Sequence, residues 1–578
     1  MYLHQFDYLF AIGTIFAFLD AWNIGANDVA NSFATSVSSR SLTYIQAMCI
    51  GSVMEFTGSI AVGARVSDTI RTKIVDVTLF EDNPALLMLG MVCAVCASSL
   101  YLTFATRFGM PVSTTHSIMG GILGMGIAAV GTDGIQWWGG NINSGVTQVF
   151  LGWVIAPVLA GAFGAVIFLI TKYGVMLRKN PVMKAFVTVP IYFGVTSALL
   201  TMLIVWKGGS AKIKISDAET VGVIIGVGAG VALLVTIFFL PWLYCVLIRN
   251  DWQLRWWHIP LGPLLLRRGE VLPPPAGHNA VRDYYRGHLT MEQLQAKRAA
   301  QKTKSENNEH NGAASHEKGF NTPDDMIHSD SEGAATPVMA EAQTYSIIGP
   351  RPEGGKFHPA VLFWHFKRVF FHGVEQDVIS MQKKNGILTG DIEAIHARAT
   401  HYDNRAEYMY SFLQAMTAAT ASFTHGANDV SNAIGPYTTI YYIWSTNQLK
   451  SKTPVPYWIL AFGGAAIVIG LWTYGYNIMR NLGNRITLHS PSRGFSMELG
   501  SAITVIVATR LKLPVSTTQC ISGATVGVGL CAGTWRTINW RMVAWIYMGW
   551  IITLPVTGII SGCIMGIIIN APRWGIAL

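Results

Sequence analysis

The sequence predicts an all-α polytopic membrane protein with about twelve transmembrane segments, arranged as two inverted repeats with re-entrant or broken helices. Three observations support this fold class. Of the 578 residues, 51% are hydrophobic and only 13% are charged, which is about half the charged share of a soluble globular protein. Long stretches of the chain contain almost no charge, and one pair of polar motifs occurs in both halves.

Twelve stretches are apolar enough to be helices that cross a membrane, which takes about 20 residues per crossing. Seven precede a long polar insertion, at 8–28, 43–63, 86–106, 112–130, 146–170, 186–206 and 219–248. Five follow it, at 408–438, 457–479, 496–511, 514–532 and 542–570. The segments at 496–511 and 514–532 are short, and short segments interrupted by Gly or Pro are typical of broken or re-entrant helices.

The polar insertion divides the chain into three parts. Residues 1–250 form an N-terminal membrane block with the first repeat, and residues 401–578 form a C-terminal block with the second. Residues 251–400 lie between them, and the tract from Lys297 to about Glu341 is too polar to bury a core, which predicts partial disorder. The many Lys and Arg residues of the insertion favour the cytoplasmic side for it and the extracellular side for both termini.

Composition also excludes some classes of protein. The net charge of +9 is spread over short loops without a dense basic stripe, so no nucleic-acid partner is expected. The seven cysteines lie nearly all inside apolar runs, where packing is their usual role. No set of nucleophile and base and no GxxxxGK[ST] loop is present. We therefore expect neither an enzyme nor a bound cofactor.

Internal duplication is the most informative feature. GANDVANSFATS at 25–36 recurs as GANDVSNAIGPY at 426–437, and ATRFGMPVSTTHS at 105–117 recurs as ATRLKLPVSTTQC at 508–520. The spacing from GANDV to PVSTT is 86 residues in the first half and 88 in the second. Seven crossings separate the two GANDV copies, so an odd number of crossings predicts inverted repeats, which place binding sites near the membrane midplane.

The GANDV motif predicts a cation site in each half. An aspartate at membrane depth is costly unless it faces a cavity or a cation. Carboxylate and carboxamide oxygens are hard ligands of the kind that sodium needs. The alternative is a helix cap or a hydrogen bond between helices. The candidate sodium ligands are Asn27, Asp28, Asn31, Asn428, Asp429 and Asn432.

The PVSTT motif predicts an anion site. Proline followed by hydroxyl residues is typical of a helix start, whose free N–H groups and positive dipole end suit a tetrahedral oxyanion. The alternative is ordinary capping of a re-entrant helix. The candidate anion-binding residues are Ser113, Thr114, Thr115, Ser516, Thr517 and Thr518.

Four further residues are candidates for coupling the cation to the anion. Glu55 and Glu498 each interrupt an apolar run, but they are not repeat-equivalent: counted back from PVSTT, Glu498 matches Val95. His116 and His425 adjoin the motifs, where a histidine could titrate near neutral pH. For each of them, a purely structural hydrogen bond is the alternative.

These paired motifs around a long polar loop resemble the inorganic phosphate transporter (PiT) family. FDYLFAIGTIFAFLDAWNIGANDVANSFATSVSSRS near the start and NLGNRITLHSPSRGFSMEL near the end look like the fungal sodium/phosphate symporters of that family. The resemblance implies sodium-driven uptake of phosphate at the plasma membrane. It also implies that Asp28 and Asp429 contribute to the phosphate site as well as to the sodium sites. The expected partners are phosphate, sodium and the lipid bilayer, with a homodimer left open.

Other functions agree with the same residues. A proton-coupled oxyanion carrier would use Glu55, Glu498 or His116 as proton sites, and a carrier of sulfate would use the same helix-start donors. A transporter-like phosphate sensor would signal through the polar insertion.

Overall fold

The computed structural model describes residues 3–64, 74–138, 145–206, 216–269, 271–275, 281–312, 348–374, 377–382, 388–450, 454–510 and 515–571. Within these ranges the protein is helical, with one isolated β-bridge between Val75 and Ile135. Each of the twelve predicted membrane segments coincides with a helix. Eight helical stretches of the described chain are long and apolar enough to cross a membrane. The prediction of an all-α polytopic fold is therefore confirmed.

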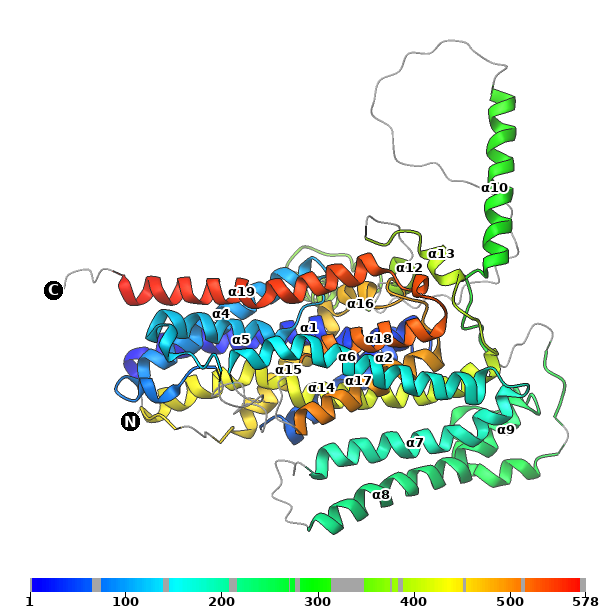
Figure 1. Ribbon diagram of the computed structural model, residues 1–578, viewed down its shortest axis with the longest axis horizontal. Helices are drawn as coiled ribbons and strands as arrows, with labels where there is room; N and C mark the ends of the chain where they lie inside the picture. Colours follow the sequence, from blue (N-terminus) through cyan, green and yellow to red (C-terminus); the bar gives the residue numbers. More distant parts are fainter. Residues whose placement is uncertain are drawn as a thin grey trace.

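The first block contains α1 (Asp7–Ser38), α2 (Tyr44–Val62), α4 (Pro84–Arg107), α5 (Thr114–Val130) and α6 (Val146–Thr171). The second block contains α14 (Asn404–Thr446), α15 (Tyr457–Tyr474), α16 (Tyr476–Leu482), α17 (Pro491–Arg510), α18 (Thr517–Ala532) and α19 (Trp540–Asn570). The start of α1 and the end of α19 lie at the same end of the bundle (Figure 1).

The two blocks are interleaved rather than side by side. Helix α2 of the first block packs on α14 of the second, and α15 packs on α1. In the same way α5 packs on α19, and α6 packs on α18. Each helix pair has a counterpart with the two halves exchanged, which is the arrangement of two repeats related by a pseudo-twofold axis.

Helices α1 and α14 are antiparallel, which confirms that the repeats are inverted. Near the start of α1, Asp7 accepts a hydrogen bond of 2.8 Å from the indole of Trp444, close to the end of α14. Just after the end of α1, the hydroxyl of Ser39 donates to Gln414, near the start of α14, at 2.7 Å. The two motif-bearing helices therefore cross the centre of the molecule in opposite directions.

Helices α7 (Pro181–Trp206) and α8 (Asp217–Leu234) lie outside both repeats. They pack on each other, α7 also packs on α14, and the pair forms the lower edge of the bundle in Figure 1. A short helix, α9 (Leu240–Leu247), then leads into the polar insertion. Most of the apolar side chains of α8 face outward, as expected of a helix that faces lipid.

The polar insertion contains short helices on one end of the bundle: η6 (Trp256–Arg267), α11 (Pro359–Phe370), α12 (Val378–Gln382) and α13 (Ile392–Ala397). The tract from residue 297 is predicted to be disordered, but its first part continues helix α10 (Met291–Gly312), which stands away from the bundle (Figure 1). Ala, Gln, Lys and Arg dominate the start of α10, and these residues favour helix. The remainder of the tract, from residue 313 to about Glu341, lies outside the described residues.

Candidate functional site

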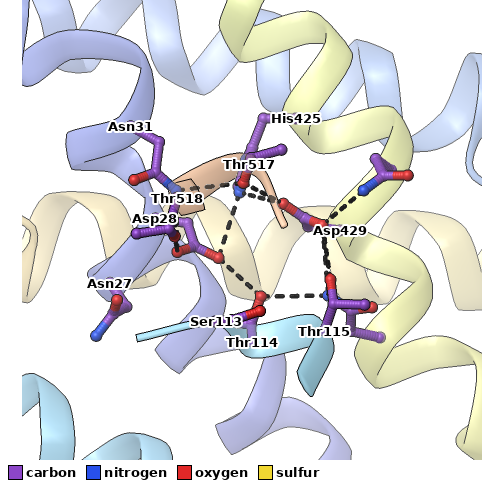
Figure 2. Close-up of polar contacts among 12 residues, drawn as sticks. Asn27, Asp28, Asn31, Ser113, Thr114, Thr115, His425, Asp429, Thr517 and Thr518 are labelled. Carbon is purple, nitrogen blue, oxygen red and sulfur yellow. Dashed lines mark hydrogen bonds and ion pairs between the residues drawn. The ribbon is translucent and has the colours of Figure 1, made fainter. Parts of the chain in front are cut away.

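The two copies of GANDV and the two copies of PVSTT meet at one place inside the bundle (Figure 2). The GANDV residues lie within α1 and α14, and the PVSTT residues form the starts of α5 and α18. None of the motif side chains that were predicted to bind ions is more than 9% exposed. The structure therefore brings together, in a buried setting, the carboxylates and hydroxyls that the sequence predicts for two different ions.

Asp28 is bonded to both helix starts. Its Oδ2 accepts a hydrogen bond from the Thr114 hydroxyl at 2.8 Å, within the first repeat. Its Oδ1 accepts from the Thr518 hydroxyl at 3.0 Å, which comes from the second repeat. Asn31, one turn further along α1, donates to the same Oδ1 at 3.1 Å. The carboxylate therefore ties the two repeats together.

Asp429 accepts the equivalent threonine bonds with the halves exchanged, and it has one further donor, Asn428. Its Oδ2 accepts from the Thr517 hydroxyl at 2.8 Å, within the second repeat, and its Oδ1 accepts from the Thr115 hydroxyl of the first repeat at 3.5 Å. The amides of Asn428 and Asn432 donate to that Oδ1 at 2.8 and 3.4 Å. Thr114 and Thr517 occupy equivalent positions, as do Thr115 and Thr518, so the hydrogen bonds follow the pseudo-twofold axis.

The remaining motif residues position the chain around this cluster. Asn27 accepts from the backbone N–H of Val112 at 3.2 Å and donates to the Met110 carbonyl at 3.1 Å, which holds the extended segment before α5. The Ser113 hydroxyl accepts from the backbone N–H of His116 at 3.2 Å and caps α5. Ser516 occupies the same position before α18, but its side chain makes no capping bond.

His425 connects the cluster to Glu55. Its Nδ1 lies 2.7 Å from a Glu55 oxygen, and its Nε2 lies 3.0 Å from Asp429 and 3.6 Å from Asp28. A neutral imidazole has one N–H and can donate to only one of these carboxylates. Both close contacts together suit an imidazolium, which would offset part of the negative charge of three buried carboxylates. Two sequence candidates, Glu55 and His425, thus form one chain of contacts.

Glu498 forms a separate junction between the two central helices. It accepts hydrogen bonds from hydroxyls of α1 and from an amide and a hydroxyl of α14; the donors are Thr35, Ser36, Gln414 and Thr417. Thr35 lies seven residues beyond Asp28, which is about 10 Å along the helix. Glu498 therefore acts next to the ion cluster and not in it.

His116 also lies apart from the cluster. Its Nδ1 accepts a hydrogen bond of 3.2 Å from the indole of Trp153 on α6. Its backbone belongs to the start of α5, but its side chain faces a different neighbour from those of Thr114 and Thr115. The position next to the motif was its only signal in the sequence, and that signal does not fix the direction of a side chain.

Two glycine contacts show which residues are equivalent in α2 and α15. A Cβ on Gly25 would lie 1.9 Å from the carbonyl oxygen of Ile467, and a Cβ on Gly426 would lie 2.3 Å from the carbonyl oxygen of Glu55. Because Gly25 and Gly426 are equivalent, Ile467 takes the place of Glu55 in the other half. Both Glu55 and Glu498 therefore have apolar counterparts, and the two glutamates break the symmetry of the site.

The donors around the two glutamates were not predicted from the sequence. They are Ser422 at Glu55, and Thr35, Ser36, Gln414 and Thr417 at Glu498. Their signal was weak, because single Ser and Thr residues in apolar helices commonly bond to their own helix backbone. Only the glutamates themselves marked these places.

The cluster has the chemistry of a paired cation and anion site. Ligand atoms of Asp28, His425 and Asp429 lie within 4.8 Å of one another. The Oδ1 of Asn31 is buried and accepts no hydrogen bond from a described residue, so it is an available oxygen ligand. A small cavity of about 20 Å³ lies beside the cluster, lined in part by Asn31, His425 and Thr517. The hydroxyls now donate to carboxylates, and an anion would have to take over these bonds.

Comparisons with known proteins agree with this chemistry. Residues 24–561 match the model of the phosphate transporter family. The chain is 68% identical to the phosphate-repressible phosphate permease of Neurospora crassa, over the whole length of both proteins. It is 26% identical to sodium-dependent phosphate transporter 2 of Homo sapiens, over 93% of this chain and 94% of the human one. A solved structure of a sodium-dependent phosphate transporter aligns with 98% of the chain at 25% identity and a TM-score of 0.61.

Proposed function

We propose that this chain, which belongs to the phosphate transporter family, is a symporter that carries phosphate into the cell together with sodium by alternating access. Phosphate transport and a multi-pass membrane location follow from the family. Coupling to sodium, uptake at the plasma membrane, the cytoplasmic position of 251–400 and the extracellular position of the termini are parts of the proposal.

The observation that carries the proposal is the shared cluster itself. Two aspartates from inverted repeats contact the hydroxyl donors of both helix starts, so a cation at the carboxylates and an anion at the donors would be neighbours. Two unit charges 4 Å apart interact by about 4 kcal/mol at an effective dielectric constant of about 20. Without a cation, Asp28 and Asp429 would repel phosphate. Bound sodium would cancel that repulsion, and each ion would raise the affinity for the other by the same factor.

The relatives provide independent support for sodium as the coupling ion. Both the human relative and the aligned solved structure are described as sodium-dependent. In this chain, the carboxylate and carboxamide oxygens of the two GANDV motifs are the ligand types that a hard monovalent cation prefers. The same motifs supply the aspartates that face the phosphate-binding hydroxyls in the proposal.

The test is uptake of radiolabelled phosphate into proteoliposomes, with sodium and proton gradients imposed separately. An inward sodium gradient should drive uptake by the unmodified chain. Asp28→Asn and Asp429→Asn should each abolish the stimulation by sodium, while the exposed control Asp133→Asn should retain it. Unchanged sodium dependence in both cluster variants, with normal folding in detergent, would contradict the proposal.

A proton-coupled phosphate carrier is the second candidate, and the contacts of His425 favour it. A histidine within 3.0 Å of both Glu55 and Asp429 could pass a proton between carboxylates. Uptake that persists without sodium and follows the pH gradient in the same vesicles would identify this mechanism in place of the first.

A further inference from the structure

One buried carboxylate lies outside the cluster described above. Asp20 is on α1, two turns before Asp28, and its side chain is fully buried. Neither of its oxygens accepts a hydrogen bond of ordinary geometry from a described residue. An ionised carboxylate without partners is costly at membrane depth. At least two close polar partners surround each of the other central carboxylates, namely Asp28, Glu55, Asp429 and Glu498. Beyond the Ser98 hydroxyl, Asp20 has no donor among the described residues, so a cation or a proton is needed to offset its charge.

Residues of the neighbouring helix α4 lie beside Asp20, among them Ser98 and Cys96. The Ser98 hydroxyl on α4 faces the carboxylate, and it lies 2.9 Å from the Ser117 hydroxyl on α5. Asn23, one turn after Asp20, donates its amide to the Ser99 carbonyl at 3.3 Å and to the Thr103 hydroxyl at 2.9 Å.

These bonds fix the orientation of the Asn23 carboxamide. Its Oδ1 is buried and accepts no hydrogen bond from a described residue. Two unsatisfied acceptors, from Asp20 and Asn23, thus lie three residues apart on one face of α1.

We propose that Asp20, Asn23 and Ser98 form a site for a monovalent cation outside the central cluster, called here the second site, and that the cation is sodium. The site offers a carboxylate, a carboxamide oxygen and a hydroxyl, which are hard ligands. A single cation would satisfy the unpaired acceptors of both Asp20 and Asn23. The site lies eight residues from Asp28, about 12 Å along the axis of α1, and is therefore separate from the central cluster.

The site exists in one half only. The positions equivalent to Asp20 and Asn23 on α14 are Ala421 and Thr424, so the second repeat has no carboxylate there. The proposed ion therefore adds one unpaired charge to the symmetric pair of GANDV sites. It lies toward the start of α1, so an ion that enters from that end of the bundle would meet Asp20 before it reaches Asp28. This role in transport rests on the proposed sodium symport, but binding of the cation does not.

The experiment measures binding of radioactive sodium to the purified full chain in detergent, without phosphate. The central sites are disabled by Asp28→Asn together with Asp429→Asn. This double variant should keep part of the sodium binding of the unmodified chain, and adding Asp20→Asn should remove the remainder. The matched control adds Asp7→Asn, an exposed residue at the start of the same helix, and should leave the remaining binding unchanged.

Equal sodium binding in the double and the triple variant would overturn the proposal. A complete loss of sodium binding in the double variant would also overturn it. A third contrary outcome is that Asp20→Asn removes a titrating proton but no bound sodium, since Asp20 would then be a proton site. If Asp20→Asn does not fold, Ser98→Ala in the double-variant background tests the site without changing charge. It should weaken the remaining binding about tenfold, equivalent to about 1.4 kcal/mol, and unchanged affinity would again overturn the proposal.

The outcome is independent of the test of symport. Residual binding that depends on Asp20 would support the second site even if phosphate uptake proved independent of sodium. Sodium-driven uptake without such residual binding would remove the second site and leave the symport proposal standing.

Discussion

The amide of Asn31 donates a hydrogen bond of 2.8 Å to the hydroxyl of Thr518, although 487 residues separate them in the chain. The equivalent bond in the other half joins Asn432 to Thr115 at 3.1 Å. Each asparagine follows the aspartate of one repeat and reaches the helix start of the other. These two contacts link the cation-binding part of each half to the anion-binding part of its partner.

Asn31→Ala and Asn432→Ala should therefore weaken coupling between the ions. Each variant removes donors to two threonines of the other repeat, while the carboxylates remain. We expect the sodium concentration for half-maximal uptake to rise about tenfold, equivalent to about 1.4 kcal/mol, with similar effects in both variants. Phosphate uptake measured at increasing sodium concentrations gives this half-maximal value. The control is Asn570→Ala, at an exposed position at the end of α19. A normal sodium dependence in either variant would contradict the symmetric role.

His425→Gln should weaken the binding of phosphate but not the binding of sodium. The change would remove the positive charge of the imidazolium that the contacts of His425 suit. The carboxylates would still attract sodium, but they would repel phosphate more strongly. We expect a higher KM for phosphate without a loss of sodium affinity, measured by titrating each ion at saturating levels of the other. His116→Gln changes a histidine that contacts Trp153 instead, and it should have a smaller effect on the KM for phosphate. Equal effects of the two changes would argue against a special place for His425.

Glu498→Ala should destabilise the bundle more than Glu498→Gln. Alanine leaves four buried donors from α1 and α14 without an acceptor, at about 1–3 kcal/mol for an unsatisfied group, whereas glutamine keeps one acceptor oxygen. Thermal unfolding in detergent should give a lower midpoint for alanine than for glutamine, and uptake should fall in the same order. Glu393→Gln, on the exposed surface, is the control. Equal unfolding midpoints for the two Glu498 variants would show that its acceptors are not needed.

Gly25→Ala and Gly426→Ala should prevent normal packing of the central helices. The new Cβ would lie 1.9 or 2.3 Å from a backbone carbonyl oxygen of α15 or α2, and backbone cannot move aside as a side chain can. Size-exclusion profiles should show little monodisperse protein. Gly230→Ala on α8, where a Cβ meets nothing within 4 Å, should purify normally. A well-folded Gly25→Ala variant would mean that α1 and α15 can separate without loss of the fold.

Much of this arrangement was predictable from the sequence. Apolar length located the helices, and repetition of GANDV and PVSTT showed that Asp28 and Asp429 belong together. The crossing count even gave the inversion of the repeats. These signals are local or periodic, and so they survive without knowledge of the packing.

The contacts that break the symmetry were not predictable to the same degree. The sequence showed that Glu55 and Glu498 are not equivalent, but not that His425 contacts Glu55 while His116 faces Trp153. Such partners depend on which face of a helix meets which neighbour. Glycines that are far away in the sequence, such as Gly426 opposite Glu55, determine these helix contacts. Asp20 carries no such signal in the sequence, because it is a single aspartate near the GANDV motif and the second repeat has Ala421 at the equivalent position.

Because the two halves are interleaved, the central site is completed only late in biosynthesis. Asp28 and Thr518 are 490 residues apart, and synthesis at about 5–20 residues per second takes roughly 25 to 100 s to cover that length. Throughout this interval the newly inserted first half holds Asp28 without the donors of α18, and α1 without its neighbour α15. Until the last helices are inserted, Asp28 has only its partners within the first half, such as Thr114. A chain that ended after its first block would hold Asp28 inside the bilayer without the Thr518 donor.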